Sequence, residues 1–84
     1  MKRQITSTRK ENDVITAICN SSAWWSPVSS SQAIREIENK TYRYFVRIGF
    51  DEVDIHVVDG ANGKYLRTDP DRTEKNNLLE LPDC

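Results

Sequence analysis

The sequence predicts an α+β fold with the element order β-β-α-β-β-β. The strands form an antiparallel sheet, one helix packs on one face of it, and an ordered C-terminal tail follows. Residues 42–48 and 53–58 alternate apolar and polar side chains, as half-buried strands do. A helix-start signal at Ser29 opens a short amphipathic segment. Two segments with β-branched residues, which precede this helix, indicate a hairpin. A helix this short is not stable alone, so its apolar stripe is expected to pack on the sheet.

The N-terminal hairpin is expected from two extended segments, residues 4–9 and residues 14–19. Both contain β-branched residues, and the turn-forming residues 11–13 separate them. Residues 20–28 then form a loop that leads to the helix.

The helix is expected to span residues 30–39. Ser29 and Gln32 fit a capping box, in which the Ser29 hydroxyl accepts a hydrogen bond from the third helical amide. The apolar stripe consists of Ala33, Ile34 and Ile37.

Residues 42–48 and 53–58 are expected to pair across a connection at residues 49–52. The expected register sets Ile48 opposite Val53, Val46 opposite Ile55, Tyr44 opposite Val57, Arg47 opposite Asp54 and Phe45 opposite His56. This pairing keeps one face apolar and places opposite charges side by side on the other face.

The last strand is expected at residues 64–68, after the hairpin signal Asn62-Gly63. Tyr65 and Leu66 are the candidates for its packed side.

The 84 residues are expected to form one domain, residues 1–84. Residues 69–84 form its extended tail, which leucine side chains hold against the sheet. Residues 1–3 and 83–84 are expected to be frayed, because chain ends are ordered only where they are tied down.

Composition favours a cytoplasmic protein with no membrane contact. The net charge is −1 and charged residues make up 30% of the chain. No apolar run approaches the about 20 residues of a membrane-spanning helix, and no signal-peptide pattern follows the basic start. Cys19 and Cys84 are too few for a disulfide framework, so we expect two free thiols in a reducing compartment.

Catalytic, metal-binding and cofactor-binding residues are not expected. Cys19, His56 and Cys84 are too scattered for a zinc site or a Cys–His nucleophilic pair. The acidic run that begins at Asp69 lacks the glycine of a calcium-binding loop, which favours a simple turn. We therefore expect no enzyme and no cofactor.

Several strings in the chain fit the pattern of a known family. They are Ile5-Thr6, Val14-Ile15-Thr16-Ala17-Ile18, Trp25, Gln32-Ala33-Ile34, Ile37-Glu38, Thr41-Tyr42-Arg43-Tyr44-Phe45-Val46, Lys64-Tyr65-Leu66-Arg67-Thr68, Pro70-Asp71, Asn76-Asn77-Leu78-Leu79 and Leu81-Pro82. On these strings, nearly the whole chain resembles the small bacterial proteins of the domain-of-unknown-function family numbered 3892. The resemblance implies a bacterial or phage source and a cytoplasmic setting, and it supplies no catalytic residues. The family pattern has one Trp before the helix, so which of Trp24 and Trp25 takes that place stays open.

The favoured function is a non-enzymatic protein-interaction module that binds a partner protein or a second copy of itself. Trp24 and Trp25 are hard to bury together in a thin core, and exposed Trp is enriched at interface hot spots. Either one ring is exposed or both pack internally. Tyr65 and Arg67 are further candidate contacts near the tail.

The alternative is a module that binds single-stranded nucleic acid through Arg43, Phe45 and Arg47. Aromatic rings that stack bases and cations that meet phosphates form such sheet platforms. Against it, the expected Asp54 partner would neutralise Arg47, and the pI of about 5.8 is far from the basic range of such domains.

Overall fold

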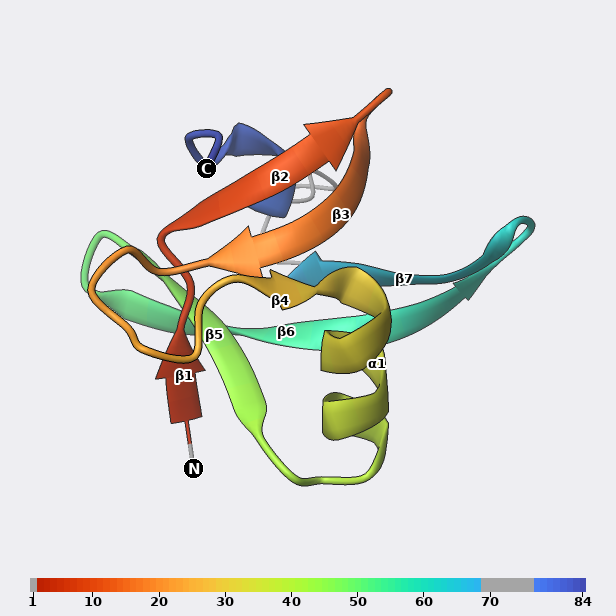
Figure 1. Ribbon diagram of the computed structural model, residues 1–84, viewed down its shortest axis with the longest axis horizontal. Coiled ribbons are helices and arrows are strands. Elements are labelled where there is room, and N and C mark those ends of the chain that lie inside the picture. Colours follow the sequence, from red (N-terminus) through yellow and green to blue (C-terminus); the bar gives the residue numbers. More distant parts are fainter. Residues whose placement is uncertain (1, 69–76) are drawn as a thin grey trace.

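One hydrophobic core joins two sheets and a helix in the computed structural model, which describes residues 2–68 and 77–84 (Figure 1). The strands are β1 (Lys2–Gln4), β2 (Ser7–Glu11), β3 (Val14–Cys19), β4 (Val28–Ser29), β5 (Arg43–Ile48), β6 (Asp51–Gly60) and β7 (Gly63–Thr68), and the helices are α1 (Ser30–Glu38) and the 3₁₀ helix η1 (Asn77–Glu80). The predicted α+β class, with a helix packed against sheet, is confirmed.

The strands form two sheets where the sequence predicted one. The first has the order β1-β5-β6-β7 and the second the order β2-β3-β4. β1 runs parallel to β5, and the other strand pairs are antiparallel. The short strand β4 was not predicted.

The division between the sheets falls within the predicted first strand. The Ile5 amide donates to the Phe45 carbonyl of β5 at 2.8 Å, whereas the Thr6 amide donates to the Cys19 carbonyl of β3 at 2.9 Å. Successive amides of a strand point to opposite sides, so one extended segment can serve two partners at this point. β1 and β2 are therefore separate strands.

The helix begins as predicted, because the Ser29 hydroxyl accepts a hydrogen bond from the Gln32 amide at 3.2 Å. α1 packs against strands of both sheets. Ala33 is fully buried, and Ile34 and Ile37 are half-buried against the core.

The predicted apolar face of β5 and β6 forms the centre of the core. Tyr44, Val46 and Ile55 are buried, and Val57 is half-buried. Leu66 of β7 is also buried, whereas Tyr65 is exposed, so only one of the two candidates lies on the packed side.

The register between β5 and β6 differs from the prediction by two residues. Val46 lies opposite Val53 and Ile48 lies opposite Asp51. The turn is therefore short, and Gly49 adopts a φ of +61° at its first central position, where a type II′ turn takes glycine. A shift of two residues leaves every side chain on its predicted face.

The charged face has different neighbours as a result. Arg47 lies opposite Glu52 and Phe45 lies opposite Asp54. The predicted pairs Arg47–Asp54 and Phe45–His56 are wrong.

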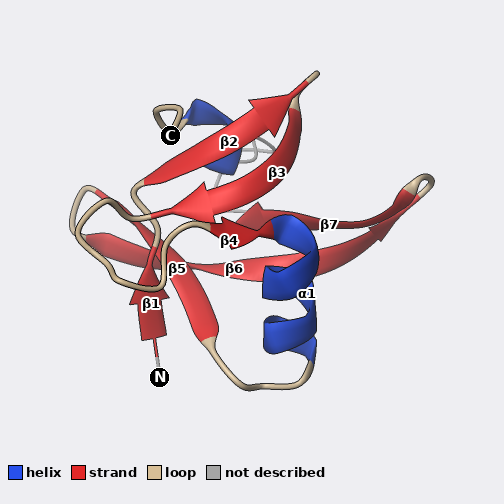
Figure 2. Cartoon of the chain, in the orientation of Figure 1, coloured by secondary structure: helices blue, strands red, loops and turns tan. Residues whose placement is uncertain are grey.

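β6 and β7 continue as a long ribbon whose tip projects from the rest of the molecule (Figure 2). His56 and Arg67 lie opposite each other in this ribbon, as do Val57 and Leu66. The ribbon places the exposed residues of β7 away from the N-terminal strand.

Both described chain ends, which were expected to fray, pair with strands of the sheets. Lys2 and Arg3 belong to β1. At the other end, Asp83 pairs with Thr8 of β2, and the Cys84 amide donates to the Thr8 carbonyl at 3.0 Å. Residues 69–76 of the predicted tail, with the acidic run that begins at Asp69, lie outside the described residues.

The cysteines form a disulfide, Cys19–Cys84, with an S–S distance of 2.06 Å. The expectation of two free thiols is wrong. In the part of the chain that the structure describes, no helix is long and apolar enough to cross a membrane.

Candidate interaction site around Arg3 and Trp24

The loop between β3 and β4 is held in place by Asn20. The Asn20 side-chain oxygen accepts from the Ser22 amide at 3.0 Å, and its side-chain amide donates to the Gln4 carbonyl at 3.0 Å. The Asn20 backbone amide donates to the Ser26 hydroxyl at 2.9 Å, and its carbonyl accepts from the Ala23 amide at 2.9 Å. These bonds fasten the loop to β1 and close it on itself.

The two tryptophans of this loop have different surroundings, which the sequence left open. Trp24 is 89% exposed, whereas Trp25 is half-buried and packs against the core. The Trp25 ring meets the Tyr44 ring edge-on, with centroids 6.0 Å apart and planes at 73°. Trp25 therefore fastens the loop to the sheet, and Trp24 faces outward.

A guanidinium group from β1 lies among the aromatic rings. Arg3 Cζ is 3.5 Å from the ring centroid of Tyr42, 5.0 Å from that of Trp25, and 5.9 Å from those of Trp24 and Tyr44. Arg3 is only 7% exposed. Cation–π contacts are strongest where water is excluded, at roughly 2 kcal/mol each. The rings thus replace part of the hydration that Arg3 loses.

Arg3 has few polar partners for a buried cation. Within residues 2–68 and 77–84, no carboxylate forms an ion pair with Arg3, and its buried Nε atom has no hydrogen-bond partner. Its Nη1 atom donates to the Tyr44 hydroxyl at 3.1 Å. The Tyr44 hydroxyl in turn donates to Glu36 Oε1 at 2.6 Å.

The Tyr44 hydroxyl is therefore a link between a cation and a carboxylate. Burial, followed by the hydrogen bond to Glu36, raises the pKa of Tyr44 to about 12. A phenol with such a pKa stays protonated at neutral pH and is a weak base and nucleophile. The arrangement suits binding and orientation of side chains rather than proton transfer.

The structure does not bring all four predicted contact residues together. Trp24 and Trp25 flank Arg3 of β1, whereas Tyr65 and Arg67 lie on β7 at the opposite edge of the same sheet. Three strand spacings separate these edges, or roughly 14 Å. Tyr65 is exposed and Arg67 is half-buried.

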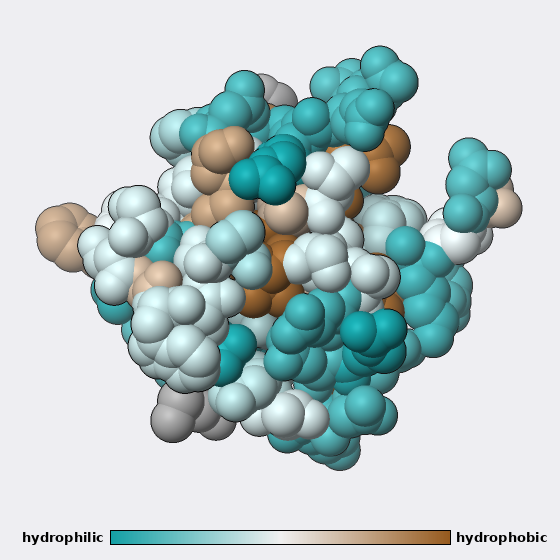
Figure 3. All heavy atoms as spheres, viewed as in Figure 1, coloured by the Kyte–Doolittle hydropathy of each residue, from teal (hydrophilic) through white to brown (hydrophobic). Residues whose placement is uncertain are grey.

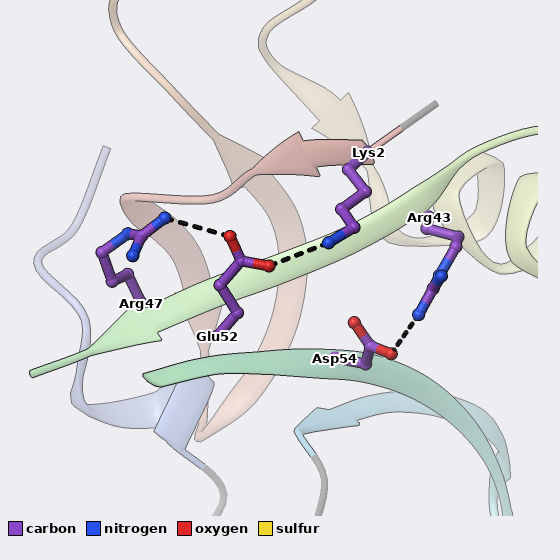
Figure 4. A network of polar contacts seen from close by, with 5 residues as sticks. All are labelled: Lys2, Arg43, Arg47, Glu52 and Asp54. Carbon is purple, nitrogen blue, oxygen red and sulfur yellow. Dashed lines mark hydrogen bonds and ion pairs between the residues drawn. The ribbon is translucent and has the colours of Figure 1, made fainter. Parts of the chain in front are cut away.

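The basic stripe predicted on β5 is extensively ion-paired (Figure 4). An Arg43 nitrogen lies 2.6 Å from an Asp54 carboxylate oxygen, and an Arg47 nitrogen lies 3.0 Å from Glu52. Lys2 joins from β1, with its ammonium group 2.9 Å from the second Glu52 oxygen. The hydrogen bond from Lys2 is the largest cause that lowers the pKa of the Glu52 carboxyl.

Phe45 lies in the same stripe but offers little ring surface. Its exposed fraction is 8%, and the Lys2 ammonium lies 5.8 Å from its ring centroid. Bases stack on open aromatic faces, and this ring is covered instead.

Arg3 and Tyr42 are the members of the site that sequence reasoning missed. Arg3 precedes the buried Ile5 by two residues, so strand alternation puts both on the same face. That spacing could have indicated a buried arginine. Tyr42 precedes Tyr44 by two residues and shares its face in the same way.

Exposed hydrophobic side chains elsewhere are scattered. Figure 3 shows a face that is mostly hydrophilic or neutral, where hydrophobic residues reach the surface only in small separate areas. Within the described ranges, no group of three or more His, Cys, Asp and Glu side chains could hold a metal ion.

Comparison with curated proteins and with solved structures gives no match. A family model does match the chain, over residues 4–82 of its 84 residues. The matched range contains the tryptophan loop and α1, but only Gln4 of β1, so Arg3 lies outside it. The chain therefore belongs to the family described as Protein of unknown function (DUF3892).

Proposed function

We propose that this protein is a non-enzymatic interaction module that binds a partner protein through Trp24. The observation that carries the proposal is the 89% exposure of Trp24 on a loop that hydrogen bonds hold in one conformation. An ordered loop loses little conformational entropy on binding, so more of the burial energy appears as affinity.

The size of the Trp24 ring determines how much binding free energy its burial in an interface can contribute. A tryptophan side chain buries about 200 Å² in an interface. At about 25 cal/mol per Å², this corresponds to roughly 5 kcal/mol before the costs of association are subtracted. A loss of at least about 2 kcal/mol on truncation is the usual mark of a hot spot.

Binding experiments with two aromatic truncations test the proposal. Trp24→Ala is the test variant, and Phe50→Ala is the matched control, because Phe50 is also fully exposed but lies in the β5–β6 turn. The full chain is immobilised, proteins of the native host are captured and identified, and their affinities for each variant are measured.

We expect Trp24→Ala to weaken partner binding by about 30-fold or more, which corresponds to about 2 kcal/mol. Phe50→Ala should change it by less than about threefold. The melting temperature of Trp24→Ala should stay close to that of the wild type. Equal binding by Trp24→Ala and wild type would contradict the proposal. If the partner is a second copy of the chain, sedimentation of the protein alone gives the same comparison.

Binding of single-stranded nucleic acid through Arg43, Phe45 and Arg47 is the alternative. This alternative has less support than a protein partner. The Phe45 ring is covered and both arginines form ion pairs, whereas Trp24 is exposed. Salt-sensitive retention of single strands that is lost in the Arg43→Ala, Arg47→Ala double variant would favour this alternative.

We place the module in the cytoplasm of a bacterium or a phage-infected bacterium. In such a reducing compartment, glutathione and thioredoxin keep most thiols reduced. The structure contains the Cys19–Cys84 disulfide, so a cytoplasmic setting requires that these reductants open it in the cell. Rapid alkylation of a native extract should then trap both cysteines largely as thiols. A fully oxidised pair would contradict the cytoplasmic setting without bearing on Trp24.

A further inference from the structure

A hollow of about 360 Å³ lies between the C-terminal end of α1 and strands β5 and β6. Its apolar wall contains Ile37, Tyr44 and Ile55. Small-molecule sites typically occupy about 300–1,000 Å³, with an apolar wall and a few polar groups. The hollow is therefore large enough for a small organic ligand.

The polar side of the hollow carries an excess of positive charge. Lys40, Arg43 and Asp54 line it, and an Arg43 nitrogen lies 2.6 Å from an Asp54 oxygen. Lys40 forms no ion pair with any residue in the described ranges. Among the described residues that line the hollow, with His56 counted as neutral, two cations and one anion leave a net charge of +1. This balance favours a ligand with one negative charge.

The backbone at Lys40 gives a second, independent indication. The Lys40 amide donates to the Ile37 carbonyl at 3.1 Å, and the Thr41 amide donates to the Glu36 carbonyl at 2.9 Å. These two bonds form a Schellman motif, which ends the helix with a residue in the left-handed region.

Glycine is the usual residue at that position, because a side chain is strained there. Lys40 occupies it with a φ of +58°. A strained residue at the edge of a cavity points to a role for its side chain. The lysine occupies a position where glycine would be more stable, and it lines the hollow.

We propose that this hollow binds a small carboxylate with an apolar body. The carboxylate lies between Lys40 and Arg43, and the apolar body packs on Ile37 and Ile55. A planar carboxylate matches the guanidinium donors of Arg43, and its single charge matches the site. This site goes beyond the proposed protein interaction and does not depend on it, because Trp24 does not line the hollow.

Titration of the full chain with hydrocinnamate, followed through amide chemical shifts, tests the proposal. We expect saturable shifts at Ile37, Lys40 and Ile55. The uncharged amide of hydrocinnamate should bind at least about tenfold more weakly, and sulfate, which lacks the apolar body, should not reproduce the shifts. No saturable shift at these residues, equal binding of the amide, or equal binding of sulfate would each overturn the proposal.

Substitution of Lys40 separates its effect on ligand binding from the effect of its left-handed backbone on stability. Lys40→Gly should raise the melting temperature by several degrees, because it relieves the left-handed strain. The same variant should weaken hydrocinnamate binding by about tenfold or more, whereas Lys40→Arg should keep it within about threefold. Unchanged binding or a lower melting temperature in Lys40→Gly would overturn the proposal.

The Trp24→Ala variant, which tests the protein interaction, is also titrated with hydrocinnamate. It should leave hydrocinnamate binding within about threefold of wild type. A loss of partner binding with this ligand affinity intact would support two separate sites. A loss of hydrocinnamate binding in Trp24→Ala would overturn the independence of the hollow.

Discussion

Arg3 shows how one residue can organise a surface in a small domain. Its guanidinium lies among four aromatic rings, and its Nη1 atom donates to the Tyr44 hydroxyl. A planar, weakly hydrated guanidinium can stack on rings, whereas the compact ammonium of lysine is more strongly hydrated. The arginine thereby contacts both the half-buried Trp25 and the exposed Trp24 from β1.

Tyr44 makes this arrangement sensitive to high pH. Its pKa is about 12 in the folded protein, above the usual value of about 10, because burial and the Glu36 hydrogen bond favour the neutral phenol. A raised folded-state pKa contributes stability that is fully present below the unfolded-state pKa. That contribution is lost as the pH rises from about 10 through about 12.

We expect the free energy of unfolding to fall across this pH range more steeply in wild type than in Tyr44→Phe. Chemical denaturation at a series of pH values measures the difference, and Tyr65→Phe is the control because Tyr65 is exposed. Parallel pH profiles for wild type and Tyr44→Phe would contradict the burial of the Tyr44 hydroxyl and its hydrogen bond to Glu36.

At the scale of elements, residues 77–84, the C-terminal segment, pack along the outer edge of β2. The Thr8 hydroxyl donates to the Leu78 carbonyl at 3.0 Å, and the Lys10 ammonium donates to the Leu81 carbonyl at 2.7 Å. The Thr8 amide also donates to the Pro82 carbonyl at 2.9 Å. These contacts cover groups on the outer edge of β2 that would otherwise be open to pairing with another chain.

Leu78 is the apolar anchor of this segment. It is fully buried in the core, whereas the adjacent Leu79 is 37% exposed. We expect Leu78→Ala to reduce the free energy of unfolding by about 2–5 kcal/mol, and Leu79→Ala by less than about 1 kcal/mol. Urea denaturation of the two variants measures the difference, and equal losses would show that the segment is not anchored through Leu78.

The alternation of residues 42–58 predicted the face on which each side chain lies, but not the exposure of Ile48, the burial of Phe45 or how the strands pair. A period of two fixes the face of each residue and is unchanged by a shift of two residues. The turn chemistry decides between such registers, and the decisive feature was Gly49 with its positive φ. Expecting a four-residue connection produced the wrong partners for Arg47 and Phe45.

The candidate site could be predicted only in part, for a related reason. A pair of tryptophans in a loop indicated an exposed aromatic residue, and strand alternation could have added Arg3 to the buried face. Which ring is exposed depends on the contact between Trp25 and Tyr44, which lie 19 residues apart in sequence and meet only after the sheet has formed. The hollow at Lys40 likewise requires that α1, β5 and β6 be placed in space.

In the whole molecule, the two chain ends lie at the edges of different sheets. β1 forms one edge of the four-stranded sheet, and the C-terminal segment pairs with β2 of the other sheet. The Cys19–Cys84 disulfide joins the end of β3 to the last residue, across a sequence separation of 65. Two cysteines so far apart in sequence gave no indication of this contact, because it depends on where the C-terminal segment packs.

The length of the closed loop sets the expected effect of the disulfide. Cross-linking residues that far apart restricts the unfolded chain, and the loss of chain entropy stabilises the fold by up to about 4 kcal/mol. The contacts of Leu78 and Lys10 do not involve either cysteine, so the C-terminal segment should stay docked when the bond is reduced.

We therefore expect a thiol reductant to lower the free energy of unfolding of the oxidised wild type to that of the Cys19→Ser, Cys84→Ser double variant. The reductant should not affect the double variant, which controls for unrelated effects of the reagent. Hydrogen exchange at the Thr8 amide should remain slow in both proteins, because its bond to the Pro82 carbonyl persists. Fast exchange there after reduction would show that the disulfide, and not Leu78, holds the C-terminal segment on β2.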